Sequence, residues 1–387
     1  MTNISLWNNL DTQKRKYHNG GQKKNDRESE AYVMDIRFEK REHLKEKPDQ
    51  KHLGFGKYMT DYMFVMDWTK EEGWKDARIV PEGPITMDPA CVTLHYAQET
   101  FEGMKAYRTA EGKIQLFRPE MNAKRMINSN ARLCMPELPV DMFVEAVKAL
   151  VKVEEDWVPS EPETSLYIRP FMFATEAALG VHMASAYKFM IICCPVGAYY
   201  AEGINPVKIL VEDELVRAVK GGTGFTKCGG NYAGSILGQV KAEKMGYSQV
   251  LWLDGEHRKY VEEVGTMNIM FKIAGEIYTA PIEGTVLPGV TRDSMIHLLR
   301  DWGYKVNETR LSVDDLMKAG HDGTLEEVFG TGTAAVISPV GELRYKDDVV
   351  TINNFEIGEL TQKLYDTLTG IQWGKLEDKY GWTQIVE

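Results

Sequence analysis

The amino-acid sequence predicts a two-domain protein of the mixed α+β and α/β class. Its 387 residues are enough for two sizeable hydrophobic cores. Segments typical of strands and of helices occur in both halves of the chain. Between those halves, the stretch from Val196 to Pro206 carries glycine and proline, so we assign residues 198–208 as the connection between the domains.

The predicted domains follow a charged N-terminal segment. Residues 1–52 are polar, and their basic runs lack apolar periodicity, so we expect a partly disordered extension. Met34 offers an alternative start, and we expect residues 1–33 to be dispensable. Residues 53–197 are assigned to a smaller α+β domain, and residues 209–387 to a larger one.

Apolar and β-prone runs predict the strands of the first half, and apolar side chains at helical spacing predict its helices. The predicted strands are Met59–Trp68, Val92–Ala97, Phe101–Arg108, Lys113–Arg118, Ser165–Thr175 and Tyr187–Pro195, and the predicted helices are Met121–Leu133 and Val140–Glu155. The turn at Ala110–Gly112 makes the third and fourth of these strands a hairpin.

The second half is read in the same way and contains no internal repeat. Its predicted strands are Val207–Glu212, Gln249–Asp254, Met267–Ile273 and Glu276–Ala280, and its predicted helices are Ala233–Lys244, Thr291–Trp302 and Glu356–Gly370. In the first of these helices, spacing places Ile236, Leu237, Val240 and Met245 on one side.

Charge and composition restrict the class of protein. The net charge of -11 argues against general nucleic-acid binding and favours a cytoplasmic protein. No apolar run approaches a membrane span, and the N-terminus has no secretory pattern. The five cysteines include the adjacent pair Cys193 and Cys194 but no Cys-x-x-Cys, so we expect reduced thiols and no metal site.

A glycine-rich run from Gly221 to Tyr232 surrounds one lysine, Lys227. Glycines permit positive φ and close backbone approach, which indicates a chain wrapped tightly around that amine. A Walker loop is excluded because Cys228 stands where serine or threonine must follow the lysine, and a dinucleotide fingerprint requires glycine at position 227. Two interpretations stay open: a turn with a solvated lysine, or a lysine that forms a Schiff base with a carbonyl such as pyridoxal 5′-phosphate (PLP).

PLP also needs an anion pocket, a donor to its phenolate oxygen and an acidic partner for its ring nitrogen. Leu287–Arg292 opens a predicted helix whose N-terminus suits a phosphate, and Gly330–Ala334 is a candidate anion nest. The pair Glu262–Glu263 offers a carboxylate that would keep the ring nitrogen protonated. Taken singly, each glycine segment is more typical of a plain glycine turn, and the acidic pair is more typical of a solvated loop.

Together, these segments resemble a known family. The resemblance is carried by Gly222–Tyr232, Glu263–Asn268 and Phe329–Ala334, and upstream by Phe55–Lys57, Leu94–Tyr96, Phe101–Lys105, Leu116–Pro119, Ser165–Pro170 and Cys194–Tyr199. From about residue 54 to the C-terminus the chain resembles the branched-chain amino-acid aminotransferases, which are PLP enzymes of fold type IV. The larger domain, 209–387, is then expected to bind the cofactor.

The resemblance assigns roles to individual residues. Lys227 would form the Schiff base and move the substrate α-proton. The other residues that match cofactor contacts are Arg125, Val290, Thr291 and Thr333 at the phosphate, Tyr232 near the ring oxygen and Glu263 at the ring nitrogen. The residues that match substrate contacts are Phe55, Phe101, Tyr167 and Tyr199 in the side-chain pocket, Tyr96, Thr333 and Ala334 at the carboxylate, and Leu179 and Val181 from the second subunit of a homodimer.

Arg169 joins this set by a physical argument. An apolar pocket alone would desolvate the second carboxylate of glutamate at a large cost, so a cation must be within reach. The strand period places Tyr167 and Arg169 on one face, so we expect Arg169 at the rim of the pocket.

The resemblance implies transamination of L-leucine, L-isoleucine and L-valine with 2-oxoglutarate by a ping-pong mechanism. The alternatives with this fold are a D-amino-acid aminotransferase and an aminodeoxychorismate lyase, which lack this aromatic pocket pattern. A nucleotide-binding module and an inactive interaction protein are alternatives from other classes, and the intact Lys227 argues against the second. One departure is that Ala335–Ser338 replaces the Cys-x-x-Cys of the mammalian members, so a thiol switch of that kind is not expected.

Overall fold

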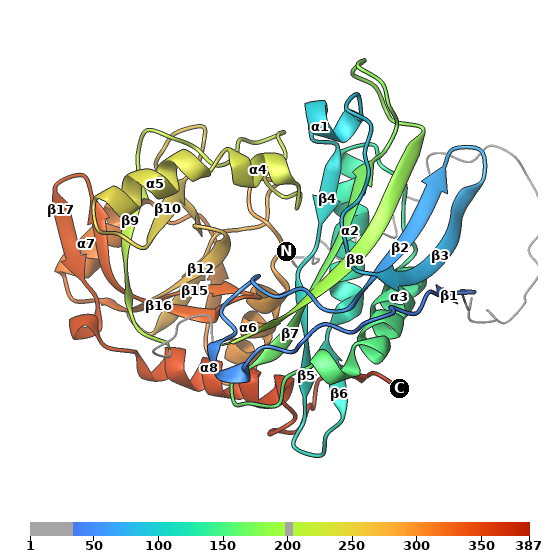
Figure 1. Ribbon diagram of the computed structural model, residues 1–387. Coiled ribbons are helices and arrows are strands. Elements are labelled where there is room, and N and C mark those ends of the chain that lie inside the picture. The colour runs from blue at the N-terminus through green and yellow to red at the C-terminus, as the bar shows by residue number, and fades with distance from the viewer. Residues whose placement is uncertain (1–33, 198–203) are drawn as a thin grey trace, which may run out of the picture. The chain divides into compact units, whose positions relative to one another are not determined.

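Two β-sheets organise the chain, and each is built from strands that lie far apart in the sequence (Figure 1). The computed structural model describes residues 34–197 and 204–387. The predictions for residues 1–33, and for residues 198–203 of the connection, therefore lie outside the described residues. In the part of the chain that is described, no helix is long and apolar enough to span a bilayer.

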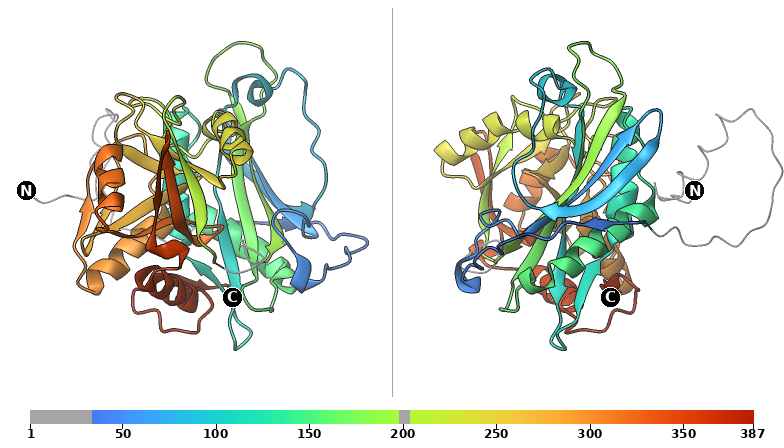
Figure 2. Two further views of the ribbon diagram at one scale, coloured as in Figure 1. Left: turned by 90° about the vertical axis from the view of Figure 1, so that its left-hand side faces the viewer. Right: turned by 45° about the vertical axis from the view of Figure 1, so that its right-hand side comes forward.

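The first sheet has the strand order β1-β3-β2-β8-β7-β5-β6-β18, and β4 pairs with β7. Its strands are β1 (Arg37–Phe38), β2 (Tyr62–Thr69), β3 (Gly73–Pro81), β4 (Glu99–Phe101), β5 (Met104–Arg108), β6 (Ile114–Phe117), β7 (Ser165–Ala174), β8 (Ala186–Val196) and β18 (Thr383–Ile385). The long antiparallel pair β7–β8 forms its centre. Figure 2 shows the C-terminal end at the edge of this sheet, where β18 pairs with β6.

Helices α2 (Pro119–Arg132) and α3 (Val140–Val153) cover one face of the first sheet (Figure 1). In α3 the residues Phe143, Ala146, Val147 and Leu150 are fully buried, at the spacing that gives a helix one apolar face. The strands contribute Leu116, Leu166 and Ile168 to the same core. Because alternate strand residues point to opposite faces, Tyr167 faces away from these helices.

The second sheet has the strand order β11-β10-β9-β16-β15-β12-β13-β14, with β17 paired to β16. Its strands are β9 (Val207–Glu212), β10 (Gln249–Leu253), β11 (Val261–Val264), β12 (Met267–Ile273), β13 (Glu276–Thr279), β14 (Val306–Glu308), β15 (Leu325–Gly332), β16 (Val336–Tyr345) and β17 (Asp348–Thr351). β11 also pairs with β12, which closes β9, β10, β11, β12, β15 and β16 into a barrel.

The remaining helices are short or lie around this barrel. They are α1 (Val92–Tyr96), α4 (Gly229–Ala233), α5 (Ile236–Lys244), α6 (Val290–Asp301), α7 (Val313–His321) and α8 (Glu359–Gln372), with 3₁₀ turns at Gln50–His52, Glu155–Trp157 and Asn353–Phe355. Helices α7 and α8 contact β15 of the barrel. All five cysteines are free, as the sequence analysis predicts.

We propose that the two sheets are the cores of the two predicted domains. β8 ends at Val196 in the first sheet, and β9 begins at Val207 in the second. Two strands come from outside the proposed bounds of the first domain. β1 lies within the segment assigned to the extension, and β18 lies in the last residues of the chain. Those two edge strands would extend the smaller domain at both ends of the sequence.

Three local predictions are wrong. Val92–Ala97 is the helix α1 and not a strand, since strand propensity in so short a run is overridden by context. The predicted strand Phe101–Arg108 is broken at Glu102 and Gly103, because the Glu102 side chain turns to Arg125 and a Cβ at Gly103 would lie 2.2 Å from the Tyr167 hydroxyl. The predicted helix Ala233–Lys244 begins only at Ile236, and that residue is 60% exposed.

Candidate active site

Lys227 lies on the loop before α4. Its backbone N–H and its carbonyl oxygen both form hydrogen bonds to the first sheet or to a helix that covers it. Its backbone N–H donates to Ser129 Oγ of α2 at 2.9 Å, and its carbonyl accepts from the Phe101 N–H at 3.0 Å. The side chain donates from Nζ to Tyr232 Oη at 2.8 Å. Nζ also lies 4.8 Å from the centre of the Phe101 ring. The amine therefore has a hydrogen-bond partner and an aromatic neighbour, which argues against a freely solvated lysine in a flexible turn.

Most glycines of this loop do not adopt a positive φ. Two of them instead let the backbone lie so close to other residues that a side chain would not fit. A Cβ at Gly224 would lie 2.4 Å from the Thr285 carbonyl oxygen, and one at Gly229 would lie 2.2 Å from Glu99 Oε1. Only Gly221 in this loop has a positive φ, of 80°. The Gly229 N–H donates to Glu99 Oε1 where α4 begins. The tight loop thus places Lys227 against β4.

Glu263, on β11, is 3% exposed and lies among polar groups that use only part of its carboxylate. Oε1 accepts from Asn268 Nδ2 at 3.0 Å and from the Leu287 N–H at 3.4 Å. Oε2 lies 2.6 Å from Arg217 Nη1 but makes no well-directed hydrogen bond within the described residues. Burial raises the pKa of Glu263 to about 7, although Arg217 acts in the opposite direction.

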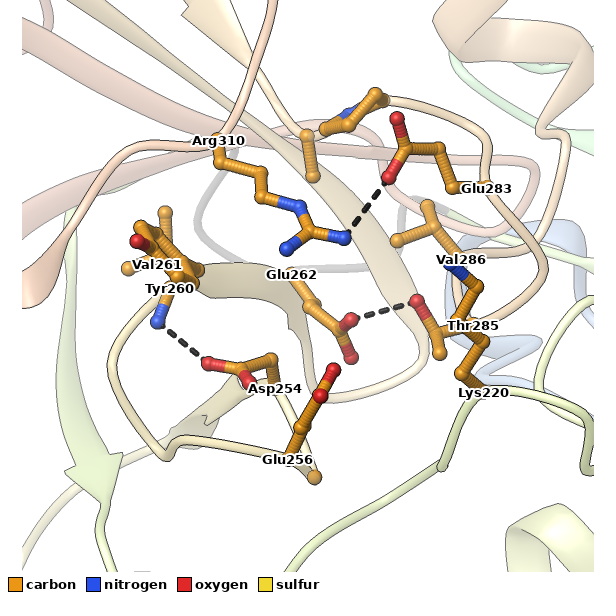
Figure 3. Close-up of a pocket in the computed structure, with 13 residues that line it drawn as sticks. Lys220, Asp254, Glu256, Tyr260, Val261, Glu262, Glu283, Thr285, Val286 and Arg310 are labelled. Atoms are coloured by element: carbon orange, nitrogen blue, oxygen red, sulfur yellow. Dashed lines mark hydrogen bonds and ion pairs between the residues drawn. The ribbon is translucent and has the colours of Figure 1, made fainter.

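The side chain of the neighbouring residue, Glu262, does not point toward the same part of the structure as Glu263. Since successive strand residues point to opposite faces, Glu262 turns away from Glu263 into a separate cavity (Figure 3). There Thr285 Oγ1 donates to Glu262 Oε1 at 2.5 Å, and Arg310 pairs with Glu283 at 3.0 Å. Within the described residues this cavity includes neither Lys227 nor Glu263. Of the acidic pair, Glu263 is therefore the residue that faces the lysine loop.

Arg125 and Glu102 form a buried pair between α2 and the break in the first sheet. Nε and Nη2 of Arg125 donate to the two oxygens of Glu102 at 2.7 and 2.6 Å. Burial alone lowers the pKa of Arg125, but Glu102 beside it holds that pKa above its ordinary value. Nη1 donates to the Pro288 carbonyl oxygen at 3.1 Å. This last bond ties the pair to the segment that begins α6.

The start of α6 and the turn between β15 and β16 are the two predicted anion sites. Gly289 is the N-cap of α6, and the buried Val290 and Thr291 occupy its first turn. A Cβ at Gly289 would lie 2.0 Å from Asn268 Oδ1, so this backbone packs directly on the Glu263 partner. Thr333 and Ala334 lie between β15 and β16. The Thr331 hydroxyl next to them is buried and has no hydrogen-bond partner within the described residues.

An aromatic wall with one cation lies beside Lys227. The Phe101 ring lies 4.9 Å from the Tyr232 ring, and the Phe55 ring lies 4.9 Å from the Tyr167 ring. The Arg169 guanidinium joins the two pairs, since it lies 4.8 Å from the Phe101 ring and 5.3 Å from the Tyr167 ring. Its Nη2 donates to Tyr167 Oη at 2.9 Å.

The four remaining predicted residues do not join this cluster within the described chain. Tyr96 Oη donates to the Leu179 carbonyl oxygen, and Leu179 and Val181 are 65% and 83% exposed. Among the described residues these three form no hydrogen bond or ring contact with the surroundings of Lys227. Tyr199 lies outside the described residues.

Sequence reasoning missed several residues that complete the cluster. Ser129, Glu102, Arg217 and Asn268 bond directly to predicted site residues. Lys105 also reaches the cluster, since its Nζ donates to the Ala334 carbonyl oxygen at 2.8 Å. Glu102 and Lys105 stand inside the Phe101–Lys105 motif, which was therefore the available signal for both. The described residues hold no group of three or more His, Cys, Asp or Glu placed to bind a metal ion.

Comparison with known proteins agrees with this geometry. A family model described as Amino-transferase class IV matches residues 99–343. Over 351 residues the chain is 54% identical to "Branched-chain-amino-acid aminotransferase 2" of Bacillus subtilis, which covers 91% of this chain and 97% of that protein. The predicted resemblance to the branched-chain aminotransferases is thereby confirmed.

Solved structures confirm the predicted fold type IV architecture. The branched-chain amino acid aminotransferase of Escherichia coli superposes with a TM-score of 0.71 at 27% identity, covering 84% of this chain and 99% of that one. The T.th. branched-chain amino acid aminotransferase complexed with N-(5′-phosphopyridoxyl)-L-glutamate has a TM-score of 0.68 at 28% identity, covering 83% of this chain and 98% of that one.

Proposed function

We propose the reaction of this chain, which belongs to the class IV aminotransferase family and is an enzyme. It transfers the amino group of L-leucine, L-isoleucine or L-valine to 2-oxoglutarate, with PLP as cofactor. The products are branched-chain 2-oxo acids and L-glutamate. The branched-chain substrates are supported by the name of the B. subtilis relative, and glutamate by the ligand of the T.th. enzyme. The aromatic wall beside Lys227 suits an aliphatic side chain.

Two side chains carry the proposal: a lysine whose amine is bonded to a tyrosine, and a separate buried carboxylate. Lys227 Nζ is bonded to Tyr232 Oη, and Glu263 Oε2 is buried without a well-directed hydrogen bond in the described part of the chain. A protonated ring nitrogen would satisfy that oxygen, so the residues present fit PLP. Lys227 would hold the cofactor covalently. The phosphate would bind between Arg125 and the start of α6, with contacts from Val290, Thr291 and Thr333.

Each side chain then has a defined task. PLP, when bound, supplies an electron sink for the bond that breaks at the substrate Cα. Once the substrate amine has displaced Lys227, the free amine of Lys227 would take the α-proton and pass it to the cofactor, with Tyr232 Oη orienting Nζ. In the opposite half-reaction the same amine would move a proton in the reverse direction, to Cα of the new amino acid. Glu263 would keep the ring nitrogen protonated. Phe101, 4.8 Å from Nζ, would exclude water from the amine.

One pocket would serve both half-reactions of a ping-pong mechanism. Phe55, Phe101 and Tyr167 would contact the aliphatic side chain of the amino acid, with Tyr199 as a further proposed wall. Arg169 would pair with the second carboxylate when glutamate or 2-oxoglutarate occupies the same space. The Thr333–Ala334 backbone would bind the carboxylate that all substrates share.

We infer a homodimer for the same enzyme, acting in the cytoplasm. Leu179 and Val181 are apolar and exposed in one chain, which is costly for a surface that stays in water. In a dimer they would complete the substrate pocket of the second subunit, together with Tyr96, whose hydroxyl is bonded to the Leu179 carbonyl.

Reduction with borohydride tests the assignment of Lys227. The purified protein should absorb visible light, and its spectrum should change when leucine is added. After reduction, peptide mapping should locate the cofactor on the peptide that contains Lys227. A colourless protein, or a label on another lysine, would refute the proposal, and a panel of L- and D-amino acids would separate this activity from that of a D-amino-acid aminotransferase.

A further inference from the structure

Lys105 is a buried cation that the proposed mechanism does not use. It is 6% exposed, and within the described residues its Nζ makes one hydrogen bond, to the Ala334 carbonyl oxygen at 2.8 Å. An ammonium group has three hydrogens to donate, and in the described residues no carboxylate forms an ion pair with this one. A buried charge without a counter-charge is costly, so this arrangement indicates that a negatively charged ligand completes it.

The position of Lys105 in the first sheet directs it toward the site. Lys105 on β5 stands opposite Tyr167 on β7 in antiparallel register, so both side chains leave the same face of the sheet. Their strand neighbours Ala106, Leu166 and Ile168 belong to the core under the helices, on the other face. Lys105 is therefore a close neighbour of the aromatic wall formed by Tyr167 and its partners.

The bond to Ala334 brings the charge to a particular part of the site. Ala334 belongs to the turn between β15 and β16 of the second sheet, so Lys105 joins the two sheets at this point. The backbone of this turn is the proposed contact for the carboxylate shared by all substrates. A carboxylate at those N–H groups would lie close to the ammonium, because both are attached to the same short peptide segment.

We propose that Lys105 supplies the positive charge that recognises the carboxylate common to every amino-acid and 2-oxo-acid substrate. Burial lowers the pKa of Lys105 to about 8, so most of the ammonium is still charged at neutral pH. The role differs from that of Arg169, which is proposed for the second carboxylate alone. The inference rests on the proposed function, since it identifies a further binding residue of the same site.

Binding of unreactive analogues to the holoenzyme separates charge recognition from packing. Three probes lack the reacting amine: 4-methylpentanoate with one carboxylate, glutarate with two, and 4-methylpentanamide with none. Their dissociation constants would be measured by calorimetry for the wild type, Lys105→Met, Lys105→Arg and Arg169→Met. Lys113→Met is the matched control, because it removes the same charge from an exposed position beside β6.

We expect Lys105→Met to weaken 4-methylpentanoate and glutarate by about tenfold to a hundredfold, the worth of a charged hydrogen bond, and to leave 4-methylpentanamide within about threefold. Lys105→Arg should recover most of the affinity for both acids, and Arg169→Met should weaken glutarate alone. In transamination, the KM for leucine should rise more than kcat falls.

Two results would overturn the inference. One is unchanged binding of 4-methylpentanoate by Lys105→Met. The other is an equal loss for the acid and the amide, which would make Lys105 a structural residue of the Ala334 turn. If Lys105→Met does not fold, Lys105→Gln removes the charge, keeps a donor and carries the same expectation. Borohydride labelling of Lys227 is independent of these measurements, so failure of the proposed function would be recognised separately.

Discussion

Replacing Arg169 with methionine should impair the enzyme toward one of its two substrates far more than toward the other. The guanidinium donates one hydrogen bond, from Nη2 to Tyr167 Oη at 2.9 Å, and its buried Nε has no hydrogen-bond partner within the described residues. Most of its donors are therefore available to a ligand. Arg169 acts electrostatically on Glu99, whose pKa is raised by burial even though the Gly229 N–H and Arg169 act against that rise.

The size of the effect follows from the contacts that are lost. A hydrogen bond to a charged group is worth roughly 1.5–3 kcal/mol, so kcat/KM for 2-oxoglutarate and glutamate should fall by about tenfold to a hundredfold. Leucine has no second carboxylate to lose. The two cation–π contacts of Arg169, at 4.8 and 5.3 Å, lie within the protein and are worth roughly 0.5–1 kcal/mol each. Their loss should affect both substrates alike, so it cancels in the ratio of the two kcat/KM values.

The two half-reactions should be measured separately, from single-turnover changes of the cofactor spectrum with leucine or with 2-oxoglutarate. Tyr167→Phe is the control, because it removes the hydroxyl that accepts the Arg169 bond and keeps both the ring and the cation. It should change the ratio of the two rate constants by less than about threefold, below the worth of one charged hydrogen bond. If Arg169→Met slows both half-reactions equally, the arginine is structural, and the argument that one cation provides dual recognition is wrong.

Two further predictions concern Glu263 and the exposed apolar pair. In cofactor-free protein, the raised pKa of Glu263 should make the unfolding free energy fall by roughly 3 kcal/mol as pH rises from about 4.5 to about 7, because the unfolded state loses this proton first. Chemical denaturation of Glu263→Gln should lack that decline, and an identical pH profile would contradict the assignment. Replacing both Leu179 and Val181 with aspartate should raise the dimer dissociation constant at least about a hundredfold, because a carboxylate is costly to bury in an apolar contact. Sedimentation would measure this, and a wild-type chain that is fully active as a monomer would count against a shared site.

The parts of the site that could be predicted from sequence are those that a short run of residues carries by itself. Lys227 is marked by its glycine loop, and the start of α6 is marked by Pro288 and Gly289. Arg217 and Lys105 carry no such mark, because their roles arise from neighbours more than 40 residues away, Glu263 and Ala334. Arg217 lies in the loop after β9, and Ala334 lies in the turn between β15 and β16, so packing between separate elements decides these contacts, and one sequence alone does not reveal that packing.

The same limit explains the errors in the fold. β9 and β12 are found with their predicted bounds, since apolar residues dominate both runs and neither contains glycine or proline. β15 and β16 were not predicted, although they complete the barrel, because glycine interrupts both runs and Pro339 also interrupts β16. Val92–Tyr96 has the composition of a strand but lacks a partner strand, and a peptide with strand propensity becomes a strand only where a partner is offered.

Buried charge gives a reason, independent of family resemblance, for placing the function where the two sheets meet. The cluster there consists of the Glu102–Arg125 pair, the Glu263–Arg217 pair and Lys105. None of these five side chains is more than 9% exposed. Replacing a buried ion pair with apolar side chains of similar volume is often neutral or stabilising, so folding alone does not explain such a cluster. Two of its members reach from one sheet toward the other, since Arg125 bonds to Pro288 and Lys105 bonds to Ala334. A ligand with a phosphate, a ring nitrogen and a carboxylate would supply the charges that these groups lack, and its binding would then stabilise the contact between the sheets as well as the reaction.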